Sequence, residues 1–306
     1  MNPTTDAKSR LRRTMMFVPG NSPKMINTAD LYGADTIMFD VEDSIAISQK
    51  DTARLMVKYA LKALPFHCET AVRVNHVTQT PFGIDDLKAI LPSKPDLIRL
   101  PKTESVEEVR LVTQLIEEVE LREGFPKGSI HIICAIESVR GLYEARMIAQ
   151  EPRVVAIALG GEDFIANLRT QRTTHGIELY HARSQILMAA RDADIQAIDT
   201  VFADVYNLDG FRKEVTDSKD MGFDGKSVVH PLQIGIVHEI YTPTEKQIEH
   251  SLKVLACYKD AVKNNRGVLT VDGKMIDGPI VVRAERIVAQ ATAAGILTEE
   301  EFNHDK

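Results

Sequence analysis

Residues 154–164 read VVAIALGGEDF: six apolar residues, two glycines, and then the carboxylates Glu162 and Asp163 before a phenylalanine. An apolar run on both parities is typical of a parallel strand that is covered on both faces. The glycine pair predicts a sharp turn at the carboxyl end of that strand. Two acids in this place either cap the next helix or take part in binding or catalysis. An isolated Glu–Asp pair is more often a helix cap.

Seven further runs of the same kind occur along the chain, and amphipathic segments separate them. The runs span 14–18, 36–40, 71–75, 97–101, 130–136, 196–201 and 226–229. Segments with the apolar spacing of helices span 51–64, 105–123, 178–193 and 209–222. Eight strand–helix units over roughly 240 residues predict an α/β fold of the (β/α)8 TIM-barrel type, whose usual size is about 250 residues. A doubly wound open sheet is the alternative, but no G-x-G-x-x-G follows the first strand.

The pattern changes after residue 241. Residues 242–267 predict one long amphipathic helix, residues 268–279 are rich in turn formers, and residues 280–295 predict a final helix. We therefore expect a catalytic barrel domain over residues 1–241 and a C-terminal helical extension over residues 242–306.

The composition narrows the class of protein. The 306 residues carry 37 basic and 44 acidic side chains, and this net charge of −7 argues against a nucleic-acid-binding protein. The three cysteines have no metal-site spacing and suit a reducing compartment. No apolar run reaches the ~18 residues of a membrane span, and the first residues lack the apolar core of a signal peptide. We expect a cytoplasmic protein whose basic stretch KSRLRR (8–13) is a mobile tail.

Charged residues stand at the carboxyl ends of most predicted strands, where a barrel places its active site. The acids are Asp40, Glu42, Asp43, Glu137, Glu162 and Asp163, and the cations are Arg73, Arg99 and Lys102. Glu137 with Glu162 or Asp163 is suited to Mg²⁺, which takes one or two carboxylates and leaves its other positions to water and substrate. Arg73 and Arg99 are suited to clamp a carboxylate. The combination predicts metal-assisted polarisation of a keto or hydroxy acid.

Several of these features also have a purely structural interpretation. Arg73 in an apolar strand can form a structural ion pair, and His230 before Pro231 is more typical of a helix cap or a packing residue than of a catalyst. The coincidence of acids and cations on one rim favours the functional interpretation of the set.

Eight segments, in order along the chain, resemble a known enzyme family. They are MMFVPGNSPKM, ADTIMFDVEDSIA, VRVN, IRLPKTES, AIESVRGL, IALGGEDF, GFDGKSVVHPLQI and GKMIDGP. Together they are similar to the citrate lyase β subunits, within the wider family of citryl-, malyl- and citramalyl-CoA lyases. The resemblance covers nearly the whole chain, and it implies a barrel of the phosphoenolpyruvate-binding type that assembles as a homo-oligomer of three or more subunits.

The resemblance also implies roles for residues at the strand ends. Glu137 of AIES and Asp163 of GGED match the ligands of a Mg²⁺ ion, and Glu137 also meets the substrate. Arg73 of VRVN matches the residue that binds the substrate carboxylate and takes part in catalysis.

Two further groups of residues are implied by the same resemblance. Phe17, Lys24, Val229 and His230 fall where relatives hold the nucleotide part of a coenzyme A thioester. Asp277 of GKMIDGP matches a catalytic acid that relatives deliver from the C-terminal tail of a neighbouring subunit.

The implied reaction is cleavage of a citryl thioester, citryl-ACP or citryl-CoA, to oxaloacetate and an acetyl thioester. In such complexes an α subunit loads citrate, and an acyl-carrier γ subunit presents it on phosphoribosyl-dephospho-coenzyme A. Asp277 is our candidate proton donor to the departing enolate, provided that its pKa is raised. The group that takes the hydroxyl proton stays open between a metal-bound water, Asp277 and Glu42.

Three alternatives accompany this prediction. A free-standing malyl-CoA or citramalyl-CoA lyase would have the same metal site. A non-catalytic barrel could serve as a scaffold for an acyl-carrier partner, although a scaffold has no need of the charged set. Phosphotransfer at the same rim is the third, and no Gly-rich phosphate loop supports it.

Overall fold

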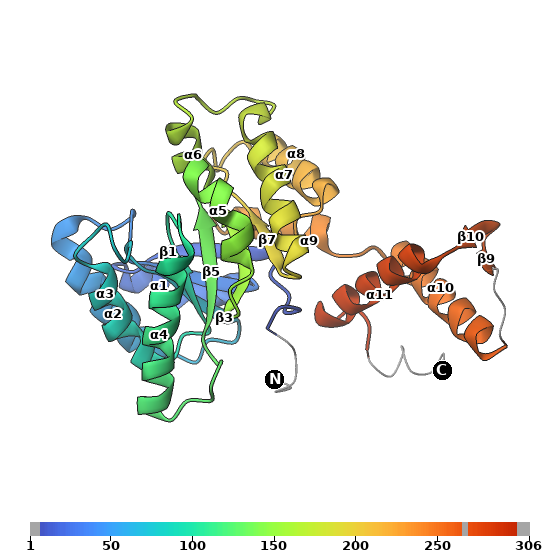
Figure 1. Ribbon diagram of the computed structural model, residues 1–306. Helices are drawn as coiled ribbons and strands as arrows, with labels where there is room; N and C mark the ends of the chain where they lie inside the picture. The colour runs from blue at the N-terminus through green and yellow to red at the C-terminus, as the bar shows by residue number, and fades with distance from the viewer. Residues whose placement is uncertain (1–6, 265–268, 299–306) are drawn as a thin grey trace. The chain divides into compact units, whose positions relative to one another are not determined.

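The computed structural model describes residues 7–264 and 269–298, and the chain divides into two compact units between His238 and Glu239. The first unit is a closed barrel of eight parallel strands in sequential order (Figure 1). These are β1 (Thr14–Pro19), β2 (Thr36–Asp40), β3 (Glu69–Arg73), β4 (Leu97–Leu100), β5 (His131–Ile136), β6 (Val154–Leu159), β7 (Gln196–Asp199) and β8 (Gly225–Val228). The TIM-barrel prediction is confirmed, and the open sheet is excluded because β1 pairs with β8.

Helices follow the strands in chain order. They are α1 (Pro23–Thr28), α2 (Lys50–Ala63), α3 (Gly83–Ile90), α4 (Val106–Glu123), α5 (Val139–Ala149), α6 (Gly161–Asn167), α7 (Ile177–Asp192), α8 (Leu208–Met221) and α9 (Leu232–Tyr241). Three 3₁₀ turns, Ala29–Tyr32, Ile47–Gln49 and Leu91–Ser93, accompany them. Ser105 caps α4 by accepting a hydrogen bond from the Glu108 N–H, and Gly222 ends α8 in the left-handed region.

The barrel interior is filled by apolar side chains from most of its strands. The cluster consists of Met15, Met38, Ala71, Leu97, Ile133, Val155, Ala156, Ala158 and Ile198, all at most 2% exposed. Phe17 lies two residues after Met15, on the same face of β1, and packs against this cluster. The packed interior forms a rigid floor for the polar groups at the carboxyl ends of the strands.

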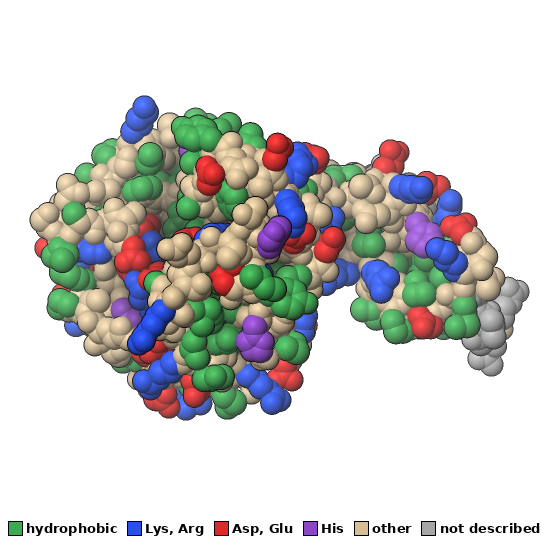
Figure 2. Space-filling view, turned by 90° about the horizontal axis from the view of Figure 1, so that it is seen from above, with side chains coloured by type: hydrophobic (Ala, Val, Ile, Leu, Met, Phe, Trp, Pro, Cys, Tyr) green, Lys and Arg blue, Asp and Glu red, His purple; other side chains and the backbone are tan. Residues whose placement is uncertain are grey.

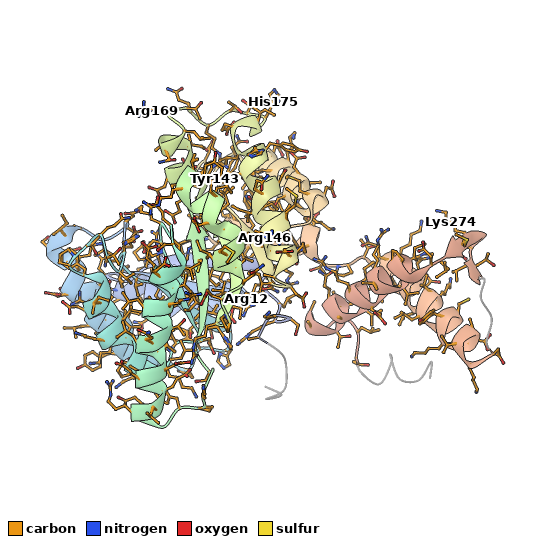
Figure 3. All side chains as sticks on the ribbon, in the orientation of Figure 1. Arg12, Tyr143, Arg146, Arg169, His175 and Lys274 are labelled. Carbon is orange, nitrogen blue, oxygen red and sulfur yellow. The ribbon has the colours of Figure 1, made fainter. Side chains whose placement is uncertain are left out.

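The amino-terminal ends of the strands are closed by an ion pair that the sequence did not predict. Arg12, labelled in Figure 3, is fully buried and donates to both carboxylate oxygens of Glu69 at 2.7 Å. It also donates to Gln196 Oε1 at 2.7 Å, so it ties β3 to β7. Arg13 pairs with Asp35 at 2.8 Å. The expectation that KSRLRR is a mobile tail is wrong, because its last two arginines are fixed by carboxylates at the base of the barrel.

The second unit has its own small core. It contains α10 (Glu245–Lys263), the hairpin of β9 (Leu269–Val271) and β10 (Lys274–Ile276), and α11 (Gly278–Ala293). The hairpin turns through Asp272 and Gly273, both at positive φ, which is the conformation of a tight two-residue turn. A cluster of apolar side chains joins the two helices and the hairpin: Val254, Leu255, Val271, Ile276, Val281, Ala284 and Val288. The extension is therefore helical, with a hairpin where the sequence indicated turns.

Element boundaries differ from the predicted ones by a few residues. β3 is Glu69–Arg73 instead of 71–75, so Arg73 is its last residue and Asn75 lies beyond it. The observed division of the chain, between residues 238 and 239, lies within the last turn of α9. The predicted division at 241/242 lies three residues later, at the end of that helix. Among the described helices, none combines the length and the apolar character that a bilayer crossing needs.

Candidate active site

A cavity of about 360 Å³ opens among the carboxyl ends of the strands. Its lining comes from β1 to β8 and consists of Phe17, Pro19, Asp40, Asp43, Ser44, Arg73, Arg99, Glu137, Leu159, Gly160, Gly161, Glu162, Asp163, Thr200, Val201, Ser227 and Val229. The size suits a small organic acid with part of a thioester arm. Figure 2 shows acidic and basic side chains interspersed on the visible face of the barrel unit.

One wall of the cavity is a paired network from β2, β3 and β4. Arg73 donates to both oxygens of Asp40 at 2.8 and 2.7 Å, and its third nitrogen lies 3.1 Å from Glu42. Lys102 donates to Glu42 at 2.6 Å and to Asp43 at 3.0 Å. Burial raises the pKa of Glu42 despite these cations, whereas Arg73 outweighs burial and holds the pKa of Asp40 below its ordinary value.

Arg99 is the second arginine of the cavity, and its hydrogen bonding differs from that of Arg73. Its side chain is 3% exposed, and its Nε and Nη1 have no hydrogen-bond partner among the described residues. The guanidinium carbons of Arg73 and Arg99 lie 4.9 and 5.2 Å from the centroid of the Phe17 ring. Phe17 therefore serves as a flat apolar face for both cations. Burial lowers the pKa of Arg99 to about 10, against the attraction of Glu137.

Glu137 comes directly after β5 and is 4% exposed, yet its Oε2 has no hydrogen-bond partner among the described residues. Burial, together with the charge of Asp163, raises the pKa of Glu137 to about 8. An unpaired carboxylate oxygen in so closed a position is unfavourable by itself. The cavity is therefore lined by one basic and one acidic side chain, Arg99 and Glu137, that have buried polar atoms without a hydrogen-bond partner among the described residues.

The glycines of the GGED turn make room for this arrangement. A Cβ on Gly160 would lie 2.4 Å from Glu137 Cγ, and a Cβ on Gly161 would lie 2.6 Å from Thr200 Oγ1. Neither glycine has a positive φ, so their role is close approach and not backbone freedom. Gly161 begins α6, and its N–H donates to Thr200 Oγ1 at 2.8 Å.

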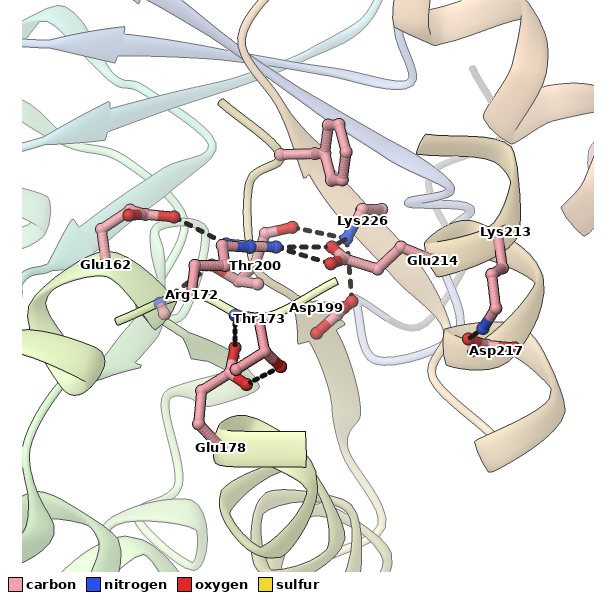
Figure 4. A network of polar contacts seen from close by, with 12 residues as sticks. Glu162, Arg172, Thr173, Glu178, Asp199, Thr200, Lys213, Glu214, Asp217 and Lys226 are labelled. Atoms are coloured by element: carbon pink, nitrogen blue, oxygen red, sulfur yellow. Dashed lines mark hydrogen bonds and ion pairs between the residues drawn. The ribbon is translucent and has the colours of Figure 1, made fainter. Parts of the chain in front are cut away.

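A charge network centred on the buried Lys226 and Asp199 contacts this turn (Figure 4). Lys226 is fully buried and donates at 2.8 Å to Asp199, to Glu214 and to the backbone carbonyl of Thr200. Arg183 and Arg172 complete it: Arg183 pairs with Asp199 at 2.9 Å, and Arg172 joins Glu214 to Glu162 at 2.6 Å. We call the six side chains of Glu162, Arg172, Arg183, Asp199, Glu214 and Lys226 the outer network. It holds the turn through Arg172, which pairs with Glu162, and through Lys226, which donates to the Thr200 carbonyl; Glu162 and Thr200 also line the cavity.

The structure brings some of the predicted site residues together and leaves others apart. Arg73, Glu137, Asp163, Phe17 and Val229 line one cavity. Asp163 is in the first turn of α6, with its side chain 44% exposed and 3.9 Å from Lys102. The proximity of Glu137 and Asp163 follows from the adjacent strands β5 and β6.

Three predicted residues lie outside the cavity lining. Lys24 is exposed on α1. The Nδ1 of His230 accepts a hydrogen bond from the Leu232 N–H at the start of α9, which is the geometry of a cap. Asp277 is exposed in the second unit, where it caps α11 by accepting from the Ile280 N–H at 3.4 Å. Their proposed roles need a ligand or a second subunit.

Some lining residues gave no signal in the sequence. Thr200, Val201 and Ser227 line the cavity from β8 and from the loop after β7. Their side chains are common and small, and only their place after a strand could have indicated them. Asn75, two residues after β3, donates to the Val41 carbonyl and to Asp86, so its role is structural.

The chain is similar to known proteins over most of its length. The HpcH/HpaI aldolase/citrate lyase family matches residues 13–231. The citrate lyase subunit beta of Escherichia coli K12 is 43% identical over 294 residues, which cover 95% of this chain and 97% of that protein. The mitochondrial citramalyl-CoA lyase of Mus musculus is 31% identical, over 92% of this chain and 86% of that protein.

A solved structure has the same architecture. CitE from Mycobacterium tuberculosis, in complex with magnesium, acetoacetate and coenzyme A, superimposes with a TM-score of 0.74 at 29% identity and covers 92% of this chain and 99% of that one. The family match spans the barrel, and the relatives extend through the second unit. The chain is a carbon–carbon lyase and belongs to the HpcH/HpaI aldolase/citrate lyase family.

Proposed function

We propose that the chain cleaves a citryl thioester to oxaloacetate and an acetyl thioester, as the β subunit of a citrate lyase. The observation that carries the proposal is the pair of open polar groups in one cavity, Glu137 Oε2 and the Arg99 guanidinium. A bound cation would pair with Glu137, and a bound anionic acid would pair with Arg99. Identity favours the citryl substrate, because citrate lyase β subunits match at 42–43% and citramalyl-CoA lyases at 30–31%.

The residues present fit a magnesium ion. Glu137 has an unpaired buried oxygen, Asp163 shares the cavity with it, and two carboxylates are the usual protein share of a Mg²⁺ site. Glu137 and Asp163 would hold the ion. When bound, it would supply Lewis-acid polarisation of the substrate hydroxyl and carboxylate oxygens. A solved relative from M. tuberculosis is described as complexed with oxaloacetate and magnesium.

The cations of the cavity bind and orient the acid. Arg73, fixed by Asp40, would present its remaining N–H groups to a substrate carboxylate. The Phe17 ring below it excludes water from one side. Cleavage leaves negative charge on the enolate of the departing thioester, and this carbon needs a proton from a positioned acid.

Asp277 is our candidate for that acid, delivered from the second unit of a neighbouring subunit in a homo-oligomer. Its side chain caps α11 only weakly, at 3.4 Å, so it can leave that role without disrupting the helix. Glu42 is a less suitable acceptor of the hydroxyl proton, because Arg73 and Lys102 already engage both its oxygens. The thioester arm would leave past Val229, which is 41% exposed, toward His230 and Lys24.

The proposal also includes the partners. A citrate lyase β subunit works beside an α subunit and an acyl-carrier γ subunit, and the carrier would present phosphoribosyl-dephospho-coenzyme A at the mouth of the cavity. Free citryl-CoA serves as a substitute for the carrier in an assay. The same cavity on malyl-CoA or citramalyl-CoA would release glyoxylate or pyruvate, which is the alternative that the assay must separate.

The test is incubation of the purified full chain with citryl-, malyl- and citramalyl-CoA, with and without Mg²⁺, while the released keto acid is measured. We expect oxaloacetate from citryl-CoA at a rate that requires Mg²⁺. Asp163→Asn should keep the fold, weaken Mg²⁺ binding roughly 10–100-fold and abolish turnover. Glyoxylate or pyruvate as the dominant product would replace the citryl assignment with the alternative, and unchanged Mg²⁺ titration in Asp163→Asn would remove that ligand.

Asp277→Ala separates binding from proton transfer. The variant should bind Mg²⁺ and oxaloacetate as the wild type does but lose roughly 10²–10⁴-fold in turnover, the usual contribution of a general acid. Mixing it with an Asp163→Asn variant should restore part of the activity, because mixed oligomers contain intact composite sites. Full turnover by Asp277→Ala alone would exclude the residue from the mechanism.

A further inference from the structure

The two guanidinium groups of the cavity differ in what they leave free. Arg73 donates to Asp40 from Nε and Nη2, and its Nη1 lies 3.1 Å from Glu42. Its charge is therefore already compensated by two carboxylates of the chain. Arg99 lies beside it in the sheet, since Arg73 and Arg99 are register partners across β3 and β4, but its Nε and Nη1 have no partner.

An unpaired buried guanidinium is unfavourable for folding, and no described residue accepts a hydrogen bond from Arg99 Nε or Nη1. Glu137 has the opposite charge and lies close enough to act on the pKa of Arg99, yet Glu137 Oε2 and the Arg99 nitrogens all remain without partners. Arg99 is held in place by the Phe17 ring at 5.2 Å. Each of these two unpaired nitrogens forms, together with Nη2, an edge of the planar guanidinium that matches the two oxygens of a carboxylate.

The possible substrates differ in the number of carboxylates that the unpaired Arg99 guanidinium could bind. Cleavage of a citryl thioester yields a keto acid with two carboxylates, oxaloacetate. Malyl and citramalyl thioesters yield glyoxylate and pyruvate, which have one. If Arg73 takes the carboxylate next to the keto group, a citryl substrate needs a second cation for its other carboxylate, and a malyl substrate does not.

We propose that Arg99 is a specificity-determining residue that binds the second carboxylate of a dicarboxylic keto acid and its parent thioester. This inference rests on the proposed function for the reaction, but it concerns the choice of acid and can be measured by binding alone. The guanidinium of Arg99, which lines the cavity, donates to both oxygens of that carboxylate, and the buried charge is paired only when a dicarboxylic acid is bound.

The experiment measures binding of oxaloacetate and of pyruvate to the full chain with Mg²⁺ by titration calorimetry. In Arg99→Met we expect the Kd for oxaloacetate to rise roughly 10²–10³-fold, because a buried charge-assisted pair is lost. The Kd for pyruvate should change less than about threefold, which a general structural defect would not spare. Arg99→Lys keeps the charge without the fork and should lie between, with a rise of roughly tenfold for oxaloacetate.

Arg110→Met is the matched control, since Arg110 is an exposed arginine of α4 that pairs only with Glu151 in the described structure. It should leave both affinities unchanged. Equal weakening of oxaloacetate and pyruvate in Arg99→Met and Arg99→Lys would overturn the proposal, as would wild-type affinity for oxaloacetate in either. If the wild type does not cleave citryl-CoA but the shift between the two acids appears, the proposed function fails and the role of Arg99 stands.

Discussion

Two groups of buried charge in the barrel unit differ in how completely they are paired. In the outer network, Lys226 has three acceptors at 2.8 Å (Figure 4). Arg183 pairs with Asp199 and lies 3.4 Å from Glu214. In the cavity, Arg99 and Glu137 keep polar atoms without partners among the described residues. The GGED turn contacts both groups: Gly160 lies against Glu137 of the cavity, and Glu162 pairs with Arg172 of the outer network.

The difference indicates what each group is for. A buried charge that has all its partners fixes the surrounding backbone, and removal of one partner leaves the others uncompensated. A buried charge without partners lowers stability and persists where a ligand completes it. The outer network is therefore expected to govern the stability of the turn, and the cavity pair to govern binding and turnover. The predictions that follow test this separation.

Glu137→Gln should give the largest effect, and it should fall on function. We expect a loss on the order of 10³-fold in turnover and weaker binding of Mg²⁺, because the neutral amide is a poor ligand. The melting temperature should change little, since the amide keeps the size of the side chain and Glu137 Oε2 has no hydrogen-bond partner to lose. Keto-acid release, Mg²⁺ titration and thermal unfolding check the three parts. A clear fall in melting temperature with activity retained would contradict the separation.

Lys226→Met should do the opposite and lower stability by roughly 3–5 kcal/mol, because Asp199 and Glu214 would stay buried with less compensation. Urea unfolding of the full chain measures the change. Lys213→Met is the control: it breaks an exposed pair with Asp217 on α8 and should change stability by less than about 1 kcal/mol. A loss in Lys226→Met no greater than in the control would show that the outer network is not structural.

The same network predicts the direction of a pH effect. Burial opposes ionisation of Asp199, but Lys226 and Arg183 outweigh it and hold its pKa well below the ordinary value. A depressed carboxyl pKa stabilises the fold above the unfolded pKa of about 4, and that contribution is lost as the pH falls through the folded value. The difference between wild type and Lys226→Met should therefore be full at neutral pH and shrink in acid.

Sequence patterns predicted the barrel well because its strands are short apolar runs separated by helices with clear periodicity. The charged rim was predictable too, since parallel strands bring residues such as Arg73, Glu137 and Asp163 to one end of the barrel. The outer network was not, because it joins Lys226 to side chains 12 and 27 residues away on other elements. A lysine inside the run KSVV was its one signal. Arg12 was missed because a basic stretch before the first strand looks like any solvated end.

Gly160→Ala should give the smallest effect and shows how closely the two groups are joined. The new methyl would lie 2.4 Å from Glu137 Cγ, so Glu137 must shift. We expect Mg²⁺ affinity to fall by roughly tenfold with a modest loss of stability. Gly235→Ala is the control, because its Cβ meets nothing within 4 Å and its φ is not positive. Unchanged Mg²⁺ affinity in Gly160→Ala would show that the turn tolerates displacement of Glu137, and the close approach would lose its functional reason.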